Sequence, residues 1–349
     1  MTWLDAPLIR ALRQPSVMAT FSLADWDLVL RQARSSQLLG RLGAVIRQAG
    51  IDVPPPVHRH LTAMDSIVRK QHGAVRWEVD RMAHALAAID HPVLLLKGAA
   101  YVLAQGAAAL GRTFSDIDIL VPRSGLAAVE DALHVSGWVS AKTSEYDQRY
   151  YRKWMHEIPP LVHYRRETTL DVHHNILPET ARIRVDPAPI FDARVPIAGF
   201  RNMHVPSLAD QILHSACHLF HEGEWRHGLR DLSDLDLLLR AYLEEGTADA
   251  LVQRARILNL EIPLTYAVSC AGRVFDTPFP SGAALRRRRW MEQLFLEAIR
   301  SAHHTMAGPL TGSAEGLLYV RSHWLRMPVR LLVPHLLHQA VRSRQEAVA

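Results

Sequence analysis

The sequence predicts an α+β fold, in which a mixed sheet with flanking helices lies between two helical parts of the chain. Before residue 90 and after residue 200, apolar residues recur every three or four positions, as on the buried face of an α-helix. Between these parts, short aliphatic runs are bounded by turn-forming and charged residues, which is typical of β-strands. We therefore expect an N-terminal helical segment (1–90), a core (91–200) and a C-terminal helical domain (201–349).

The N-terminal segment is predicted to end in one long helix. Three consecutive prolines, Pro54–Pro56, set its start, and Asp90–Pro92 set its end. Its apolar stripe consists of Leu61, Met64, Val68, Val75, Val79, Met82, Leu86 and Ile89.

The core is predicted to begin with a strand over 93–96, followed by a second strand over 116–121. A short amphipathic helix is expected from Leu126, and another extended stretch from Trp138. The aromatic and polar run 146–151 is expected to be a strand or loop at the rim of a cleft. Two further strands, 161–164 and 168–174, read as a hairpin around the polar turn 165–167.

Two aspartates in the otherwise apolar second strand are the most informative feature of the chain. Asp116 and Asp118 occupy alternate positions, so both carboxylates emerge on one face. Such a pair is costly on a buried strand unless a cation lies between the acids. Mg²⁺ prefers carboxylate and phosphate oxygens, so the pattern predicts chemistry on a nucleoside triphosphate (NTP). The alternative is a pair of surface acids at the end of an edge strand.

A third acid, Asp171, lies in the second strand of the predicted hairpin. If that strand neighbours the one carrying Asp116 and Asp118, all three acids reach the same metal. Two metal ions held by three carboxylates can activate an attacking hydroxyl and neutralise a leaving pyrophosphate. Asp171 can also act as the general base. The alternative is an acid that simply ends a hairpin strand.

These motifs resemble the nucleotidyltransferase fold of the DNA polymerase beta superfamily, and in particular its group called nucleotidyltransferase family proteins. The resemblance is specific from about residue 94 to residue 174. It rests on Lys97-Gly98, Arg112, Ser115-Asp116-Ile117-Asp118 and Leu170-Asp171-Val172-His173. Nucleotidyltransferase toxins of bacterial toxin–antitoxin pairs show a similar pattern, so that kinship stays open.

The resemblance implies transfer of a nucleoside monophosphate from an NTP such as ATP to an acceptor hydroxyl, with release of pyrophosphate. Asp116, Asp118 and Asp171 are implied to bind two Mg²⁺ ions, with Mn²⁺ as an alternative. The residues implied to serve the NTP are Lys97, Gly98, Ala99, Arg112, Ser115 and His173. Gly98-Ala99-Ala100 departs from the Gly-Ser or Gly-Gly of many members, so phosphate contacts there fall to backbone amides at the start of the next helix.

Each candidate cation or histidine also has a structural alternative. Lys97 can be an ordinary solvated cation at a strand end, and Arg112 can pair with a carboxylate instead of a phosphate. His173 can contact substrate or simply pack. His214, His218 and His221 share one face of a predicted helix; packing histidines or a cleft wall are favoured there over a zinc site.

The C-terminal part is predicted to be helical, with Ser207 as the N-cap of a helix over 208–220. The acids Asp231, Asp234 and Asp236 read as the start of a further helix, and Arg230-Asp231 is a weaker candidate for nucleotide contact. The run Arg286–Arg289 can bind RNA phosphates, but a solvated helix face is the commoner meaning. An apolar helix is expected over 328–344.

Bulk properties narrow the class of protein. The 349 residues carry a net charge of +5, which permits an anionic partner without requiring one. The two cysteines, Cys217 and Cys270, exclude a disulfide framework and suit a reducing cytoplasm. The sequence shows neither a signal peptide nor an apolar run of about eighteen residues, so we expect a cytoplasmic protein without membrane contact.

Three functional alternatives follow from these patterns. The first is an enzyme that modifies a small molecule, peptide or protein, the second a toxin-like enzyme that modifies tRNA, and the third an inactive nucleotide-binding scaffold. Intact Asp116, Asp118 and Asp171 argue against the third. The acceptor, the preferred base and the oligomeric state stay open, because one fold serves many acceptors.

Overall fold

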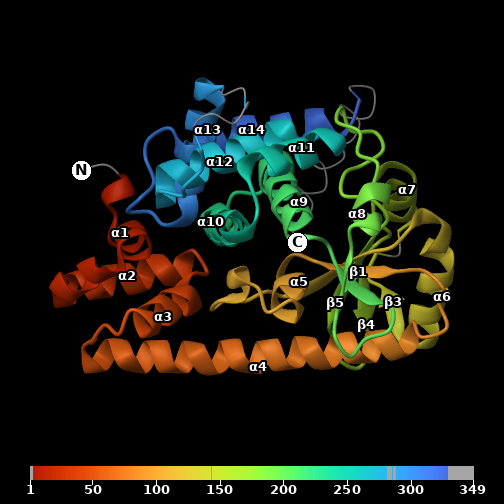
Figure 1. The fold of residues 1–349 in the computed structure, drawn as a ribbon, viewed down its shortest axis with the longest axis horizontal. Helices are drawn as coiled ribbons and strands as arrows, with labels where there is room; N and C mark the ends of the chain where they lie inside the picture. The colour runs from red at the N-terminus through yellow and green to blue at the C-terminus, as the bar shows by residue number, and fades with distance from the viewer. Residues whose placement is uncertain (1–2, 143, 281–284, 286–287, 329–349) are drawn as a thin grey trace, which may run out of the picture.

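The computed structural model describes residues 3–142, 144–280, 285 and 288–328, and it confirms the α+β fold (Figure 1). Along the chain, a seven-stranded sheet comes between N-terminal and C-terminal groups of helices; in space, the sheet and the N-terminal helices lie at opposite ends of the molecule (Figure 1). The strand order is β3-β4-β5-β2-β1-β7-β6. Within the described residues, no helix combines the length and the hydropathy that a bilayer span requires.

The centre of the sheet carries the predicted motifs. Here β1 (Val93–Leu96) pairs antiparallel with β2 (Asp116–Leu120), and β2 pairs in parallel with β5 (Thr169–His173). The hairpin prediction is confirmed, since β4 (Leu161–His163) pairs antiparallel with β5. All four residues of β1 are buried, as expected for a strand covered on both faces.

The outer strands complete a mixed, mainly antiparallel sheet. On one side, β3 (Trp138–Ser140) pairs antiparallel with β4. On the other, β7 (Met203–Val205) runs parallel to β1 and pairs antiparallel with β6 (Val195–Pro196). The expected division at residue 200 therefore falls inside the last hairpin of the sheet.

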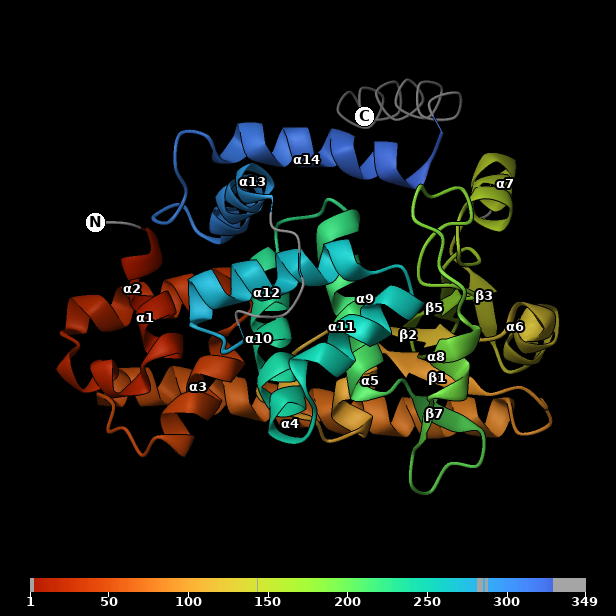
Figure 2. The same ribbon diagram turned by 45° about the horizontal axis from the view of Figure 1, so that its top comes forward.

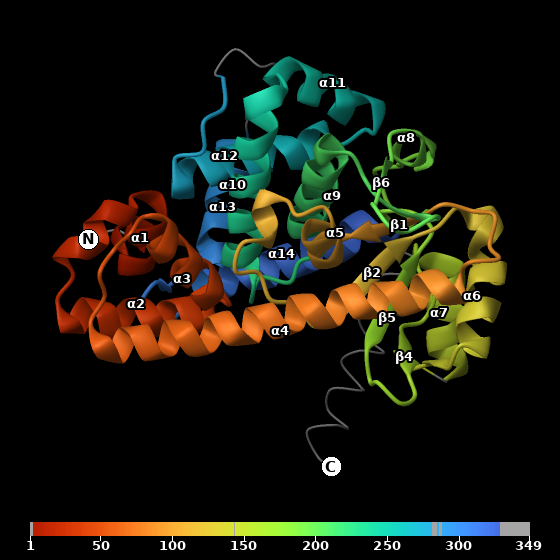
Figure 3. The same ribbon diagram turned by 60° about the horizontal axis from the view of Figure 1, so that its bottom comes forward.

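A long helix connects the N-terminal helices to the sheet. The helices α1 (Pro7–Arg13), α2 (Leu23–Ser35) and α3 (Leu39–Gln48) pack at one end of α4 (Pro55–Ala85). In Figure 3, α4 runs from this group across to the far side of the sheet. Its start agrees with the prediction, but it ends at Ala85, before the expected end near residue 90. Leu86 is buried in the turn that follows, so the apolar pattern continues beyond the helix.

Three helices accompany the strands of the core: α5 (Lys97–Leu103), α6 (Leu126–Val135) and α8 (Ala188–Asp192). A fourth, α7 (Glu145–Trp154), corrects the expectation of a strand or loop over 146–151. The Ser144 side chain accepts a hydrogen bond from the backbone N–H of Asp147, which caps this helix. No residue of α7 is fully buried, but Tyr146, Tyr150 and Trp154 follow one another at a spacing of four and form a half-buried aromatic stripe along one face.

The C-terminal helices pack over the open end of the sheet. Of these, α9 (Leu208–His221) and α10 (Gly228–Glu245) lie nearest the strands, and the Ser207 cap of α9 is confirmed. Figure 2 shows α14 (Thr311–Arg326) on the outer side, across α13 (Arg289–Ile299). The remaining helices are α11 (Ala248–Ile257) and α12 (Glu261–Phe275), with 3-10 turns at Trp3–Asp5, Pro15–Thr20, Ala107–Ala109, Arg123–Gly125 and Arg300–Ala302.

Two sequence predictions lie wholly or partly outside the described residues. The expected helix over 328–344 is described only at its first residue, and positions 286 and 287 of the basic run are not described. Arg288 precedes α13, and Arg289 is its first residue. Cys217 and Cys270 are both buried, and no disulfide joins them in the described part of the chain.

A buried ion-pair network joins the three parts of the chain. Asp234 of α10 contacts Nη2 of Arg41 from α3 at 2.8 Å and Nε of Arg112 from the loop before β2 at 2.7 Å. The side chains of Asp234 and Arg41 are 4% and 3% exposed. Arg41 also donates to the carbonyl of Ala108 at 2.8 Å. The Asp234 carboxylate, from the C-terminal helices, is thus a shared counter-charge for two buried guanidinium groups, Arg41 of the N-terminal helices and Arg112 of the core.

Buried histidines of α9 predict loss of stability in acid. Burial lowers the pKa of both His214 and His221 to about 3. The two neutral histidines contribute fully to stability at a pH above about 6.5, which is the pKa of a histidine in the unfolded chain. It is lost as the pH falls towards 3, because the unfolded chain takes up protons that the folded chain excludes. In His221→Leu, we expect the midpoint of urea unfolding to vary less between pH 6.5 and 4 than in the unmodified chain.

The exposed His58 of α4 provides the matched control for that experiment. His58→Leu should leave the pH dependence of the unfolding midpoint unchanged. Equal pH dependence in His221→Leu and the unmodified chain would show that His221 does not contribute to it.

Candidate active site

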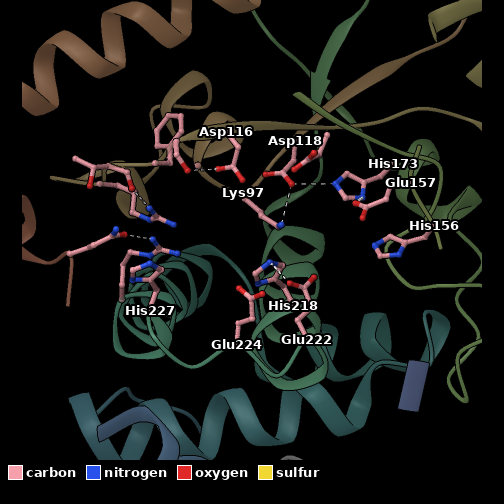
Figure 4. Close-up of a pocket in the computed structure, with 18 of the residues that line it drawn as sticks. Lys97, Asp116, Asp118, His156, Glu157, His173, His218, Glu222, Glu224 and His227 are labelled. Atoms are coloured by element: carbon pink, nitrogen blue, oxygen red, sulfur yellow. Dashed lines mark hydrogen bonds and ion pairs between the residues drawn. The ribbon is translucent and has the colours of Figure 1, made fainter. Parts of the chain in front are cut away.

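A cavity of about 620 Å³ lies between the sheet and the ends of α9 and α10 (Figure 4). All three parts of the chain line it, from Gln37 and Gln71 through the core to the C-terminal helices. The cavity brings together nearly all of the predicted site residues: Lys97, Gly98, Arg112, Ser115, Asp116, Asp118, Asp171 and His173. Ala99 is the exception, because its side chain is buried within α5.

Strand register places the three acids side by side. Asp116 and Asp118 alternate on β2, and Asp118 lies opposite Asp171 in the parallel pair with β5. Asp118 is buried, whereas Asp116 and Asp171 are partly exposed to the cavity. Among the described residues, Oδ1 of Asp171 is buried and has no hydrogen-bond partner. This oxygen is free to accept a hydrogen bond or to bind a cation.

The surroundings shift the pKa values of Asp118 and Asp171 in opposite directions. Burial and the negative charges of Asp118 and Glu157 raise the pKa of Asp171 to about 7. Burial alone would raise the pKa of Asp118 too, but Lys97 and His173 hold it well below its usual range. Near neutral pH, Asp118 is therefore an anion, and Asp171 is close to the midpoint of its titration.

Lys97 occupies the junction between β1 and α5. Its Nζ donates to Oδ1 of Asp118 at 3.1 Å. Its φ of 47° lies in the left-handed region, which is unfavourable for a residue with a Cβ. Burial alone would lower the pKa of this amine, but Asp118 and Glu222 raise it overall. Strained backbone of this kind is typical of functional sites, so it makes Lys97 a candidate for more than support.

Arg112 lies on the cavity wall and is held by acids of α10. Its Nε donates to Asp234 at 2.7 Å, and Asp231 lies 3.7 Å from its Nη2. Its Nη1 donates to the carbonyl of Thr113. The carboxylate partner that the sequence left open is thus Asp234, from the helical domain. Arg230 also lines the cavity, and it pairs with Asp231 at 2.7 Å.

Gly98 and Ser115 shape the cavity beside the acids. A Cβ on Gly98 would lie 2.7 Å from the ring of Phe114, so this close approach needs glycine. The Ser115 hydroxyl donates to Oδ1 of Asp116 at 3.3 Å. The glycine therefore lets the Phe114 ring pack against the start of α5 at the wall of the cavity.

His173 bridges two acids. Its Nε2 contacts Oδ1 of Asp118 at 3.2 Å, and its Nδ1 contacts Oε2 of Glu157 at 3.2 Å. Burial alone would lower the pKa of His173, but Asp118 and Glu157 raise it overall. The His173 ring stacks on that of His156, with centroids 5.2 Å apart. The sequence-based candidates did not include His156 or Glu157, which reach the cavity because Glu157 bridges to His173.

The wall opposite the acids comes from the end of α9 and the segment after it. There, Nε2 of His218 pairs with Oε2 of Glu222 at 2.7 Å, and Glu224 lies nearby (Figure 4). Burial alone would raise the pKa of Glu222, but His218 and Lys97 lower it overall. Of the histidine face predicted on α9, only His218 lines the cavity. Glu222 and Glu224 reach the site because the end of α9 faces the strands across the cavity, which no local sequence pattern reveals.

The donor set of the acids fits a hard divalent cation. The three aspartates offer oxygen ligands on one face, and one of these oxygens has no partner in the described structure. Asp118 is already neutralised by Lys97 and His173, which shows how strongly this position attracts positive charge.

Comparison with models of protein families shows which family the chain belongs to. A family model described as uncharacterised nucleotidyltransferase matches residues 22–276. The chain belongs to this family. The match extends from the start of α2 to the end of α12, so it includes the sheet and most residues that line the cavity. No curated protein matches the sequence.

Family membership makes the chain a transferase and implies an NTP as substrate. The sequence resemblance to nucleotidyltransferases is thereby confirmed. Which acceptor receives the nucleotide, and which side chains perform the transfer, must be argued from the cavity.

Proposed function

We propose that this nucleotidyltransferase transfers a nucleoside monophosphate from an NTP to an acceptor hydroxyl. The acceptor oxygen forms a bond to the α-phosphorus, the bond from that phosphorus to the bridging oxygen breaks, and pyrophosphate leaves. The observation that carries the proposal is the convergence of Asp116, Asp118 and Asp171 on a cavity large enough for a nucleotide.

Each residue of the cavity has a distinct task in this proposal. Asp116, Asp118 and Asp171 would hold two Mg²⁺ ions, or Mn²⁺ instead, which supply charge neutralisation during phosphoryl transfer. Asp171 would also take the proton of the acceptor hydroxyl as it attacks the α-phosphorus. Lys97 and Arg112 bind the triphosphate.

Contacts around the cavity support the triphosphate assignment. Lys97 contacts only one oxygen of Asp118, so a phosphate oxygen can become a further partner of its ammonium group. Gly98 is the second residue of α5 and lies in its first turn, where backbone N–H groups have no partners inside the helix. Ser115 contacts Asp116, and His173 holds Asp118 in place.

A second cavity, of about 390 Å³, offers a route for the acceptor. It shares Gln71, Phe114, Ser115 and Asp116 with the first. Its remaining wall includes Trp77, whose exposed fraction is 53%. A two-substrate reaction requires two binding volumes that meet at the reacting atoms, and here the shared wall carries Asp116. We therefore place the acceptor in this second cavity.

The acceptor in this proposal is a small molecule, a peptide or a protein side chain. A tRNA acceptor is the alternative, and the net charge of +5 is its main support. Incubation with α-labelled NTP separates the two. Label incorporated into RNA favours tRNA, whereas label in a small product or in protein favours the first class.

The test of the proposed function is a thermal-shift titration with each of the four NTPs, with and without Mg²⁺. An NTP at about 100 times its Kd should stabilise the fold by about 2.7 kcal/mol, which raises the unfolding temperature by several degrees. We expect one NTP to do so only with Mg²⁺. Asp116→Asn/Asp118→Asn should abolish the shift, because two neutral amides bind a divalent cation far more weakly than two carboxylates do.

The control is Asp131→Asn, an exposed aspartate on α6. It should show the full shift. A shift that persists in the double variant would contradict the assignment of the aspartates, and the absence of any shift in the unmodified chain would contradict binding of NTP in this cavity.

A further inference from the structure

Next to the three aspartates lies a second group of potential ligands with a different chemistry. One atom each from His156, Glu157 and His173 can be chosen so that all three lie within 4.8 Å of one another. His156 and His173 are buried, and Glu157 is partly buried. Figure 4 shows the three side chains together at the end of the cavity, beyond Asp118.

The backbone holds these residues in register. The N–H of His174 donates to the carbonyl of His156 at 2.8 Å, and the N–H of Ile158 donates to the carbonyl of Val172 at 3.0 Å. Between these bonds, Glu157 forms an isolated antiparallel bridge with His173. The three side chains are therefore presented by sheet-like backbone, which is a more precise scaffold than a free loop.

One nitrogen of the group is unpartnered. Nδ1 of His156 is buried and has no hydrogen-bond partner among the described residues, and the exposed fraction of the residue is 8%. A buried polar atom without a partner costs free energy, so it calls for an explanation. A metal ion would provide one, since a neutral imidazole nitrogen is a common ligand.

We propose that His156, Glu157 and His173 form a binding site for a divalent transition-metal ion, with Zn²⁺ as the best fit. Two imidazoles and one carboxylate are a ligand set that suits Zn²⁺ and related ions. The all-oxygen set of Asp116, Asp118 and Asp171 suits Mg²⁺ instead. Three protein ligands leave one position of a tetrahedral ion open towards the cavity.

The geometry of His173 links the two groups. Its Nδ1 faces Glu157, while its Nε2 contacts Asp118 at 3.2 Å. An ion on Nδ1 replaces the proton there and leaves the Nε2 proton to bond Asp118. Metal-bound histidines commonly donate their second N–H to a carboxylate in this way. The ion would thus help to orient Asp118. Binding of the ion does not depend on the proposed transfer reaction.

The experiment uses the full chain after removal of metal with a chelator. We expect one Zn²⁺ per chain in a competition titration with a chromophoric chelator. The X-ray absorption spectrum of the bound Zn²⁺ should show two imidazole ligands together with oxygen. His156→Ala and Glu157→Gln should each weaken Zn²⁺ binding about 100-fold or more, as judged by the effects of altering metal-site residues.

Asp116→Asn is the matched control, since it removes a carboxylate of the neighbouring group without touching the proposed ligands. It should bind Zn²⁺ as the unmodified chain does. Three results would overturn the proposal: no Zn²⁺ binding by the unmodified chain, a spectrum with oxygen ligands alone, or full affinity in both ligand variants. The spectrum of the unmodified chain decides the question even if His156→Ala fails to fold.

Discussion

Asp118→Asn is expected to lower kcat for nucleotide transfer by about 1,000-fold or more, a loss like that from removing a preorganised electrostatic contact in other enzymes. Asp118 occupies the centre of the acids, opposite Asp171 in the sheet, and its exposed fraction is 4%. Asparagine has nearly the same shape but no charge. It therefore keeps the packing and loses the attraction for Mg²⁺, Lys97 and His173. The measurement is the steady-state release of pyrophosphate.

The comparison that makes this result specific is Asp131→Asn, on the exposed side of α6. Its kcat should stay within about twofold of the unmodified value, as for a surface change far from the site. Thermal unfolding of both variants without metal checks that any loss of activity does not reflect unfolding. A fall of less than about tenfold in Asp118→Asn would remove this residue from the catalytic machinery.

Asp234→Asn should destabilise the fold by about 3–5 kcal/mol, which is the usual cost of removing one partner from a buried ion pair. The change leaves Arg41 and Arg112 buried without their shared counter-charge. Neither guanidinium can lose its proton near neutral pH. Because these cations come from α3 and from the loop before β2, we expect all three parts of the chain to unfold at a lower urea concentration.

An exposed ion pair provides the control for this prediction. Asp27 and Arg31 of α2 pair at 2.7 Å, but their side chains are 65% and 51% exposed. Asp27→Asn should change the free energy of unfolding by no more than about 1 kcal/mol, because water already screens the pair. Equal effects of Asp27→Asn and Asp234→Asn would mean that the buried network contributes little to stability.

Much of the core could be predicted from local patterns. The aliphatic run 93–96 became β1 with the predicted bounds, and the hairpin around 165–167 formed as expected. These predictions succeed because the alternation of side chains along a strand depends only on neighbouring residues. The same rule placed Asp116 and Asp118 on one face. The expectation for 146–151 was wrong because the helical spacing of Tyr146, Tyr150 and Trp154 and the cap at Ser144 were not recognised as the signs of a helix.

The candidate site was predicted less completely, because most of its contacts join distant residues. Asp171 lies beside Asp118 only because β5 adds to β2 in parallel. Arg112 finds its partner 122 positions further along the chain, at Asp234. Glu157 enters the cavity through the pairing of a short extended segment with β5, and Glu222 because the end of α9 faces the strands across the cavity. The periodic pattern of apolar residues along the sequence does not indicate such contacts between distant residues.

The fold class, the central strands, the apolar faces of the helices and the candidate acids all followed from the chain read alone, because backbone geometry and burial impose short periods on a sequence. The charge environment of the acids depends on packing. A pKa of about 7 for Asp171 arises from burial together with carboxylates that different strands and segments bring to it. Electrostatic energy depends on distance and on access of water, and both are properties of the folded chain.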